Sequence, residues 1–340
     1  MLYTVTITNG SESVNIHAGA QISKERNAID SMAFTIYPDN PGYALLDSMT
    51  TTIQVRNGKT GRLGFDGRVV KAPGSMDGNG LISKAVLCEG VEAYLCDSTQ
   101  PYLAERQWSG GNGRTGLQEF IDYVLARHNE RVEPHKRVYR GNVDLVTYET
   151  TGGVYKGLQR DTTRKTLFGK LVDVFGGEMR VRRNEADGLL YLDYSKKLGR
   201  DRETPVEVAR NMASVSMDED PTQVITRLYP LGAKLEDSED RITVASVNGG
   251  RQYIDDADAL AKYGILEGTQ TWDDVTQPAN LLSAARSWLA ENNRFPHSAA
   301  VSVYDLSLID KAPDELSLLD WYPCRNHLVG LDEPLEIIKQ

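Results

Sequence analysis

The sequence predicts a mostly β protein that also carries α+β insertions. Short segments near both ends of the chain alternate apolar and polar residues and are separated by dense turns, which is typical of half-buried strands. Two stretches in the middle instead show helical periodicity. The chain has 340 residues, of which 40% are hydrophobic, so several domains can each bury a core without disulfides. A β-rich part followed by a more helical part occurs twice.

Residues 31–71 contain the clearest strand signals. Ala33–Tyr37 is a short strand-like run that stops at a turn rich in proline and asparagine. Thr51–Asn57 and Arg62–Val70 alternate apolar and polar residues on either side of Gly58–Gly61. This period of two predicts an antiparallel hairpin with one buried face.

The rest of residues 1–99 fits the same β-rich pattern. Asn9-Gly10 is a strong hairpin turn between the runs Tyr3–Thr8 and Ser13–His17. Ala85–Glu89 is another expected strand, and residues 91–96 are expected to form a short helix. These elements predict a first β domain over residues 1–99.

Residues 100–211 are expected to form an α+β domain. Thr115 and Gln118 have the spacing of a capping box, and the helix they begin should run to about His128. A second helix is expected from about Thr162 to Phe175, where two glycines end it. The apolar residues of the two helices recur at helical spacing: Leu117, Phe120, Ile121, Val124 and Leu125, then Leu167, Phe168, Leu171, Val172 and Phe175. A hairpin of 178–183 and 189–194 follows.

Residues 212–340 return to strands and carry a helical insertion. The expected strands are Thr222–Tyr229, Arg241–Val247, Ala299–Leu308 and Leu335–Lys339. The insertion, residues 248–296, should hold a short helix that ends at Gly264 and a longer one that begins at Pro278. The longer helix has an apolar stripe of Leu281, Leu282, Ala285, Trp288 and Leu289.

Charge and cysteine content restrict the class of protein. The net charge is −10, but residues 101–211 hold 20 basic against 16 acidic residues, whereas the remainder holds 18 against 32. The β-rich parts are therefore the acidic ones.

Three cysteines without metal-ligand spacing indicate free thiols of a protein folded in a reducing compartment. The first nine residues alternate like a strand rather than a signal peptide, and no run of 18 apolar residues is present.

The motifs that could indicate nucleotide binding are better explained as loops. Gly111, Gly113 and Gly116 have dinucleotide-binding spacing, but no hydrophobic strand precedes them and the acidic residue expected about 20 positions later is absent. Gly58-Lys59-Thr60 lacks the first glycine of a phosphate loop. We expect residues 111–116 to form a flexible loop before a capped helix. We expect residues 58–60 to form a hairpin tip.

The sequence predicts no catalytic residues, no cofactor and no metal. His128 and His135 lack metal-ligand spacing, and His128 is expected at an exposed helix end. No GxSxG motif occurs, and Cys88 is expected to pack in a strand. The acidic clusters 218–220 and 236–240 lack calcium-loop spacing. Aromatic residues such as Tyr94, Tyr102 and Trp108 could stack on sugars, although such residues more often fill cores.

The order of several short motifs resembles a known family. The sequence shows Phe-Thr-Ile at 34–36, Pro-Gly-Tyr at 41–43, and Phe-x-Gly-Arg-Val at 65–69. Further matching segments are 87–90 with 93–95, 229–236, 246–250 and 272–276. This order resembles the N-terminal hub region of siphophage and prophage tail-tip proteins, the prophage endopeptidase tail or tail-associated lysin proteins. These proteins are related to the baseplate hub of contractile phages.

The resemblance implies a baseplate-hub-like architecture with two tube-forming β-barrels, 1–99 and 212–247 with 297–340. Residues 100–211 and 248–296 would be two smaller α/β domains. It also implies a homotrimeric ring that terminates or extends the tail tube, contacts the distal tail protein and the tube or tape-measure proteins, and anchors tip elements. Assembly would occur in the bacterial host cytoplasm, and the protein would end up at the virion tail tip.

The resemblance leads to three further expectations. The chain should not be an enzyme or insert into a membrane, and DNA should pass through an acidic channel without specific binding. Basic residues such as Arg180, Arg182 and Arg183 should lie on the periphery. Two alternatives remain: a cell-wall hydrolase whose catalytic domain lies outside this chain, and a module that binds host-surface carbohydrate.

Overall fold

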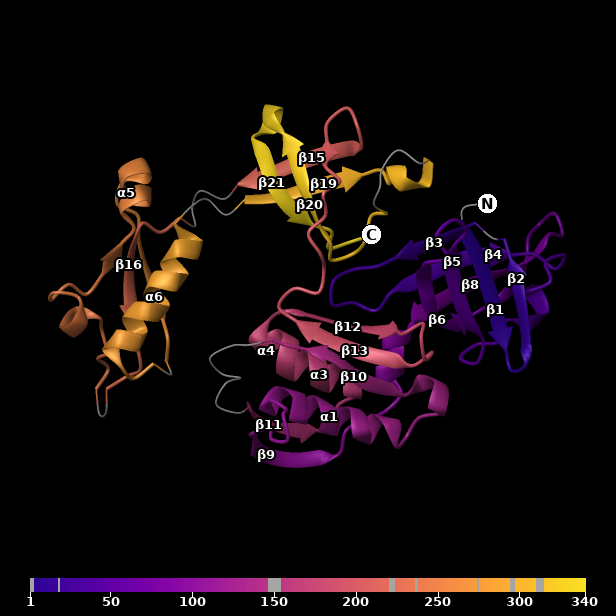
Figure 1. Ribbon diagram of the computed structural model, residues 1–340, viewed down its shortest axis with the longest axis horizontal. Coiled ribbons are helices and arrows are strands. Elements are labelled where there is room, and N and C mark those ends of the chain that lie inside the picture. The colour runs from indigo at the N-terminus through magenta and orange to yellow at the C-terminus, as the bar shows by residue number, and fades with distance from the viewer. Residues whose placement is uncertain are drawn as a thin grey trace. The chain divides into compact units, whose positions relative to one another are not determined.

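The computed structural model divides the chain into two compact units. The first comprises Met1–Val206 and Asp305–Gln340, and the second comprises Glu207–Tyr304. The structure describes residues 3–17, 19–145, 154–219, 224–235, 238–273, 275–293, 297–309 and 315–340. Strands in several separate sheets dominate both units (Figure 1), which confirms a mostly β protein with helical parts.

An antiparallel sheet forms the N-terminal part of the first unit. Its strand order is β2-β1-β5-β6-β8-β4-β3, and β7 pairs with β8. The strands are β1 (Tyr3–Asn9), β2 (Glu12–Ile16), β3 (Ala20–Ser23), β4 (Ser31–Ile36), β5 (Thr52–Asn57), β6 (Leu63–Lys71), β7 (Gly74–Met76) and β8 (Ile82–Gly90). A short 3-10 helix, η1 (Tyr43–Leu45), precedes β5. Closure of this sheet into a barrel remains a prediction.

The expected alternation determines which side chains enter the core of this sheet. Ile53 and Val55 of β5 are buried, as is Phe65 of β6, and Val55 pairs directly with Phe65. Val5 and Ile7 of β1 pair with Val55 and Ile53 of β5, respectively, and are also buried. The two predicted hairpins are therefore confirmed: their strands pair as expected, and their apolar side chains face the core.

The α+β part of the first unit has its own core. Thr115 caps α1 (Gly116–Asn129) through a complete capping box with Gln118. The second predicted helix is continuous, but its middle turn is π-helical: α3 (Thr163–Leu167), η4 (Phe168–Val172) and α4 (Asp173–Phe175). These helices bury their predicted stripes with the strands β9 (Tyr102–Trp108), β10 (Val138–Val143), β11 (Val154–Gln159), β12 (Glu178–Arg183) and β13 (Leu190–Ser195), and with the short helices η2 (Val91–Cys96) and η3 (Pro134–Lys136) nearby.

Residues 305–340 complete the first unit. Here β20 (Trp321–Asn326) pairs with β21 (Leu331–Glu336) across the short helix η8 (His327–Val329), and β20 also pairs with β14 (Val206–Glu207). The expected strand Leu335–Lys339 is wrong in its limits, because β21 begins four residues earlier and ends at Glu336. Gly330, with φ of 74°, allows the tight turn that sets this register.

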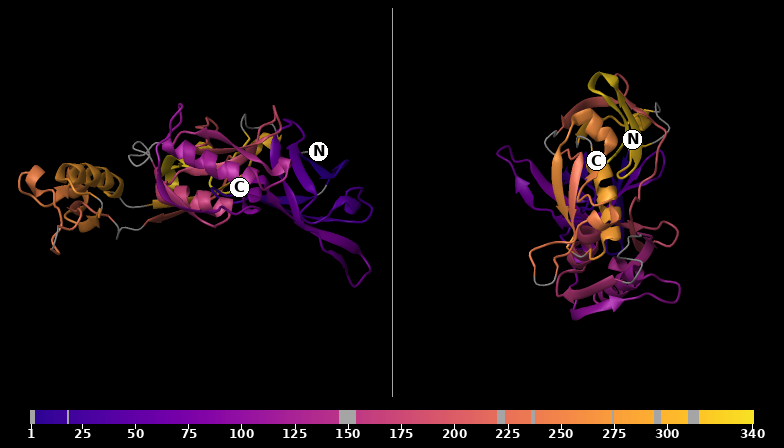
Figure 2. Two further views of the ribbon diagram at one scale, coloured as in Figure 1. Left: turned by 90° about the horizontal axis from the view of Figure 1, so that it is seen from below. Right: turned by 90° about the vertical axis from the view of Figure 1, so that its left-hand side faces the viewer.

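The second unit packs a helix on a small sheet. Strand β16 (Arg227–Leu231) lies between β17 (Ile254–Asp255) and β18 (Glu267–Thr271). The predicted helices are α5 (Ala257–Tyr263) and α6 (Pro278–Asn292), and α6 packs against β16 (Figure 2). A separate pair joins β15 (Met212–Glu219) to β19 (His297–Val303).

Two expected strands of the second unit differ from the structure. Arg241–Val247 is not a strand: Arg241 makes one isolated bridge to Lys234, and residues 245–247 form the 3-10 helix η6. The β-branched residues of this run predicted a strand, but the backbone pairing with another segment is confined to the start of the run, where Ile242 exchanges hydrogen bonds with Gly232 and Ala233 in the part of the chain that the structure describes. In the other segment, β19 ends at Val303, and η7 (Leu306–Ile309) replaces the end of the expected strand Ala299–Leu308. Part of the expected strand Thr222–Tyr229 lies outside the described residues.

Candidate functional site

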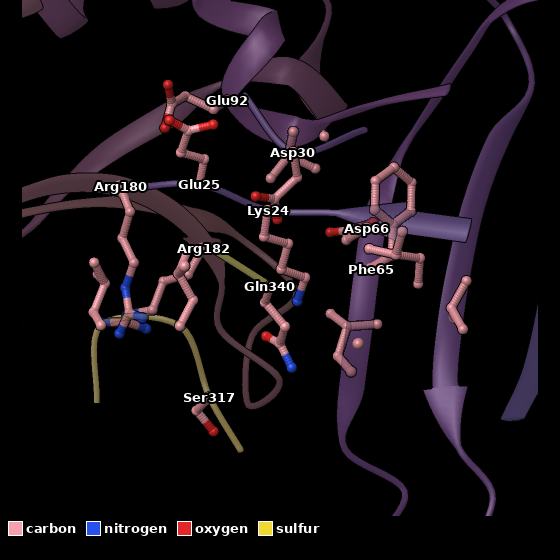
Figure 3. A pocket seen from close by; sticks show the side chains of 18 of the residues that line it. Lys24, Glu25, Asp30, Phe65, Asp66, Glu92, Arg180, Arg182, Ser317 and Gln340 are labelled. Carbon is pink, nitrogen blue, oxygen red and sulfur yellow. The ribbon is translucent and has the colours of Figure 1, made fainter. Parts of the chain in front are cut away.

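The first unit contains a cavity of about 560 Å³ whose walls come from three distant parts of the sequence. One wall is formed by strands β1, β3, β5 and β6 of the N-terminal sheet together with residues 24–30. The second wall is β12, and the third consists of residues 315–319 with Gln340. Figure 3 shows side chains from all three segments around one space.

Backbone pairing attaches the last residues of the chain to this cavity. The Lys24 N–H donates to the Gln340 carbonyl at 2.8 Å, and the Gln340 N–H donates back to the Lys24 carbonyl at 2.8 Å. The Arg26 N–H donates to the Ile338 carbonyl at 2.9 Å. Residues 338–340 thus pair antiparallel with residues 24–26, directly after β3, around an isolated bridge between Glu25 and Lys339.

Asn27 connects the same loop to β12. Its side-chain amide donates to the Gly177 carbonyl at 3.1 Å, and its side-chain oxygen accepts from the Met179 N–H at 2.9 Å. Asn27 has φ of 59°, a left-handed conformation that asparagine tolerates better than most residues. This two-point contact fixes the start of β12 against the loop.

Ion pairs surround the cavity. Arg183 of β12 reaches Asp66 of β6 at 2.6 Å, which joins the α+β part to the N-terminal sheet. Arg182 pairs with Asp193 at 2.6 Å, and Arg62 donates to the Ser317 hydroxyl at 2.8 Å. These contacts hold all three walls in place.

Two buried carboxyl groups near the cavity have unusual acidity. Burial raises the pKa of Glu92 to about 7, although its partner Arg164, at 2.7 Å, opposes the shift. Burial also raises the pKa of Glu336 to about 7, and the neighbouring Glu178 adds to the shift. Arg26, 3.0 Å from Glu336, opposes it. Two carboxyl groups in contact favour sharing a proton.

A second charged cluster stabilises the first unit around Arg68. The Arg68 guanidinium is buried and donates to both carboxylate oxygens of Asp97 and to Glu89 at 2.7 Å. Lys136 adds a further ion pair to Asp97 at 3.1 Å. The cluster links β6 and β8 to the segment after η2, so we interpret it as structural.

The prediction that His128 lies at an exposed helix end is wrong. Its side chain is fully buried, with Nδ1 2.7 Å from the Ser98 hydroxyl and Nε2 3.1 Å from the Lys136 carbonyl. A carbonyl can only accept, so Nε2 carries the proton and Nδ1 accepts from Ser98. Burial lowers the pKa of His128. The Ser98–His128 contact has the distance of a nucleophile and its base, but both side chains are shielded from solvent, so it serves packing.

The cysteines provide no reactive centre in the core. All three are free, and Cys88 and Cys324 are buried. Burial raises the pKa of Cys88 to about 12 and that of Cys324 to about 11, so both remain thiols at neutral pH. Cys96 is exposed, and partial burial of its thiol raises its pKa as well. The expectation that Cys88 packs within a strand is confirmed.

The remaining candidate motifs also have structural positions. Trp108 and Tyr94 are almost completely buried, so neither can stack on a sugar, whereas Tyr102 is exposed. The segment Gly58–Thr60 is a hairpin tip closed by the Asn57 side chain. The glycine segment 110–116 leads directly into the capped helix α1. Parts of the acidic clusters 218–220 and 236–240 lie outside the described residues.

Arg180, Arg182 and Arg183 are placed at the cavity, a position that the sequence reasoning did not foresee. Their position on the periphery of an assembled ring remains a prediction. The spacing did indicate that two of these side chains lie together. Arg180 and Arg182 are two residues apart on a strand, so their side chains lie on the same face. The other walls could not be inferred, since they come from residues near positions 25 and 317.

The described residues offer little for other chemistry. Among them, no group of three His, Cys, Asp or Glu side chains could hold a metal ion. In the same residues, none of the helices has the length and apolar character needed to cross a membrane.

Comparisons with known proteins support the resemblance to prophage tail proteins. Residues 200–340 match the family model described as prophage endopeptidase tail. The fold resembles a prophage tail protein from Listeria monocytogenes, with 14% identity and a TM-score of 0.58 over 99% of this chain and 89% of that one. A search of curated proteins gives no match.

Two further solved structures show the same fold. A prophage tail protein from Shewanella oneidensis is 13% identical, with a TM-score of 0.59 over 99% of this chain and 93% of that one. A tail protein from Neisseria meningitidis is 13% identical, with a TM-score of 0.55 over 100% of this chain and 91% of that one. The expected resemblance to prophage tail proteins is confirmed at the level of fold.

Proposed function

We propose that this chain is a structural component of a phage or prophage tail, and that it acts as a hub at the tail tip. The observation that carries the proposal is the likeness of nearly the whole chain to three prophage tail proteins. The family model matched by residues 200–340 supports it independently. A shared fold does not by itself determine function, so the hub role requires its own test.

In this proposal the chain forms a homotrimeric ring whose β domains, 1–99 and 212–247 with 297–340, build the tube. Residues 100–211 and 248–296 would be the two smaller domains. The ring would terminate or extend the tail tube, contact the distal tail protein and the tube or tape-measure proteins, and anchor tip elements. It would assemble in the host cytoplasm and remain at the tail tip of the virion.

The oligomeric state tests this role most directly. Light scattering coupled to size exclusion should give three times the chain mass, and negative-stain images should show rings. A chain that stays monomeric across a wide concentration range would contradict the ring. The fold likeness would remain valid in that case.

The acidity of the β-rich parts leads to a second test. An acidic channel would repel duplex DNA and keep it away from the wall, whereas a basic wall would bind phosphates by counterion release. We expect no salt-sensitive binding of duplex DNA to the assembled protein. Measurable binding at low salt that disappears at high salt would contradict an acidic channel.

The main alternative is a cell-wall hydrolase, because the family that residues 200–340 match is described as prophage endopeptidase tail. The buried states of His128, Cys88 and Cys324 disfavour an active site built on them. Peptidoglycan release by the purified chain, abolished by one substitution, would favour the hydrolase over the structural role. A glycan array tests the other alternative, a carbohydrate-binding module.

A further inference from the structure

The ribbon formed by β15 and β19 has no third strand in the part of the chain that the structure describes. Its two strands run antiparallel over eight and seven residues and lie side by side in Figure 1. Along residues 213–217 and 299–303, each outer edge therefore presents backbone N–H and C=O groups with no neighbouring strand among the described residues. Because an isolated two-stranded ribbon is at best marginally stable in water, this one is structurally incomplete.

The two edges of this ribbon lack the features that usually protect an exposed edge strand. Such strands are normally short, charged or interrupted by proline. Residues 213–217 read Ala-Ser-Val-Ser-Met and residues 299–303 read Ala-Ala-Val-Ser-Val, with no charged residue or proline in either segment. The acidic residues of β15 are confined to positions 218–219, and its register shift, between Met212 and Ser214, lies at the opposite end. The central part of both edges is therefore open to pairing with another strand.

Several other edge strands of this protein do carry such protection. Strands β14 and β17 each have two residues, which is too short to present a long edge. Strand β12 contains three arginines, and β21 contains three acidic residues and a proline. Against these strands, the long and uncharged edges of β15 and β19 stand out as surfaces suited to strand pairing.

We propose that this ribbon binds a second copy of the chain by strand pairing, with the outer edge of β15 in one copy against the outer edge of β19 in the next. The proposal rests on the ring proposed above and names the surface that joins its subunits. Rotational symmetry keeps the direction of each strand relative to the ring axis, and β15 and β19 run in opposite directions. The two edges therefore meet as an antiparallel pair. Each copy offers one edge of each kind, and a head-to-tail contact of this type can close into a ring.

The side chains of the ribbon are compatible with this pairing. One face exposes small side chains and the other half-buries apolar ones, which are Ser214, Ser216, Ala300 and Ser302 on the first face and Val215, Met217, Ala299, Val301 and Val303 on the second. A strand added in register continues both faces, so apolar side chains of one copy would lie beside apolar side chains of the next. Along these segments the contact removes no charged side chain from water, so no charge has to be compensated.

Charges placed on the two edges test both the contact and its direction. Ser216→Lys with Ser302→Lys puts like charges at every proposed junction, and should raise the protein concentration needed for assembly by about tenfold or more. Light scattering coupled to size exclusion measures this shift. Ser216→Lys with Ser302→Glu places opposite charges at the same junction and should assemble like wild type. The control, Thr269→Lys with Ser287→Lys, adds two positive charges at exposed positions of β18 and α6 and should also assemble like wild type.

Hydrogen exchange examines the same edges in the unmodified chain. Amides that pair with a second copy become protected, so residues 213–217 and 299–303 should exchange more slowly in the assembled protein than in protein diluted until it dissociates. Residues 267–271 of β18 should exchange equally in both states. Equal exchange of the ribbon in both states would overturn the proposal, even if far-UV circular dichroism showed that the two-lysine variant is misfolded.

The outcomes distinguish this inference from the ring itself. If the wild-type chain forms a ring and the folded two-lysine variant does so equally well, the junction between β15 and β19 is wrong and the ring stands. If the charge-swapped variant folds but fails to assemble, head-to-tail pairing of these two edges is refuted. A wild-type chain that stays monomeric at every concentration would overturn both the junction and the ring.

Discussion

Substitution of Gly232 should destabilise the second unit because the backbone passes too close for a side chain. A Cβ atom at this position would lie 2.6 Å from the Val275 carbonyl oxygen and 3.1 Å from the Ile242 Cβ. Ordinary contacts begin at 3.4 Å, so the first distance is short by about 0.8 Å. The φ of Gly232 lies outside the left-handed region, so crowding rather than backbone strain determines the effect.

Hydrogen bonds prevent the neighbouring segments from moving apart freely. The Gly232 N–H donates to the Ile242 carbonyl at 2.8 Å, and the Ala233 N–H donates to the Val275 carbonyl at 3.0 Å. Adding a methyl group must stretch one of these bonds. Overpacking of this kind typically lowers the free energy of unfolding by about 1–3 kcal/mol. We expect Gly232→Ala to fall in that range and Gly232→Val to reach its upper end or exceed it.

Urea unfolding followed by tryptophan fluorescence measures this effect, because Trp272 and Trp288 pack in the second unit. For a unit of this size, 1 kcal/mol corresponds to a shift in Tm of about 4–8 °C. Thr269→Val, at an exposed position of β18, is the control and should change stability by less than about 0.5 kcal/mol. A Gly232→Val variant with wild-type stability would refute the reasoning from close approach.

Three further predictions concern charge and thiol chemistry. Burial raises the pKa of Glu336 to about 7, so the folded chain holds a proton that the unfolded chain releases near its ordinary pKa of about 4.3. Stability should therefore decline as pH rises from about 4.3 through about 7. Glu336→Gln should flatten this decline in a Tm profile, whereas the exposed Glu12→Gln should not. Arg68→Met should lower the free energy of unfolding by about 3–5 kcal/mol in urea, because it leaves two carboxylates without their buried cation. Arg56→Met, which breaks the solvent-accessible ion pair between Arg56 and Glu185, should lower it by at most about 1 kcal/mol, and equal effects would contradict this view. A thiol reagent should modify Cys96 in the native chain but reach the two buried cysteines only after denaturation, and rapid native modification of all three would disprove their burial.

Local patterns predicted the elements that depend on local interactions. The capping box of Thr115 and Gln118 formed as expected because its two hydrogen bonds join residues three apart. The antiparallel pairing of β5 with β6 followed from alternation and from the short turn between them, whereas the register shift between Val55 and Arg56 was not predicted. In both cases the interacting residues are close in the sequence, so the pattern contains the necessary information.

The errors occurred where distant residues determine the outcome. His128 is at a helix end in the sequence, but Ser98 and Lys136 close over it in the folded chain. Ile242 has the β propensity of a strand residue, yet its backbone hydrogen bonds go to Gly232 and Ala233 and the pairing does not continue into a strand. The cavity is the extreme case, since its walls meet only after the whole first unit has folded.

The attachment of residues 338–340 to residues 24–26 has a consequence for synthesis on the ribosome. The first unit is interrupted by Glu207–Tyr304, so its last wall is translated after the entire second unit. Chains emerge N-terminus first, at about 5–20 residues per second. The backbone groups of residues 24–26, which follow β3, therefore stay open for pairing with other chains until residues 338–340 have been translated. Residues 338–340 act as the cover of this segment, and truncation before residue 338 should increase aggregation of the chain.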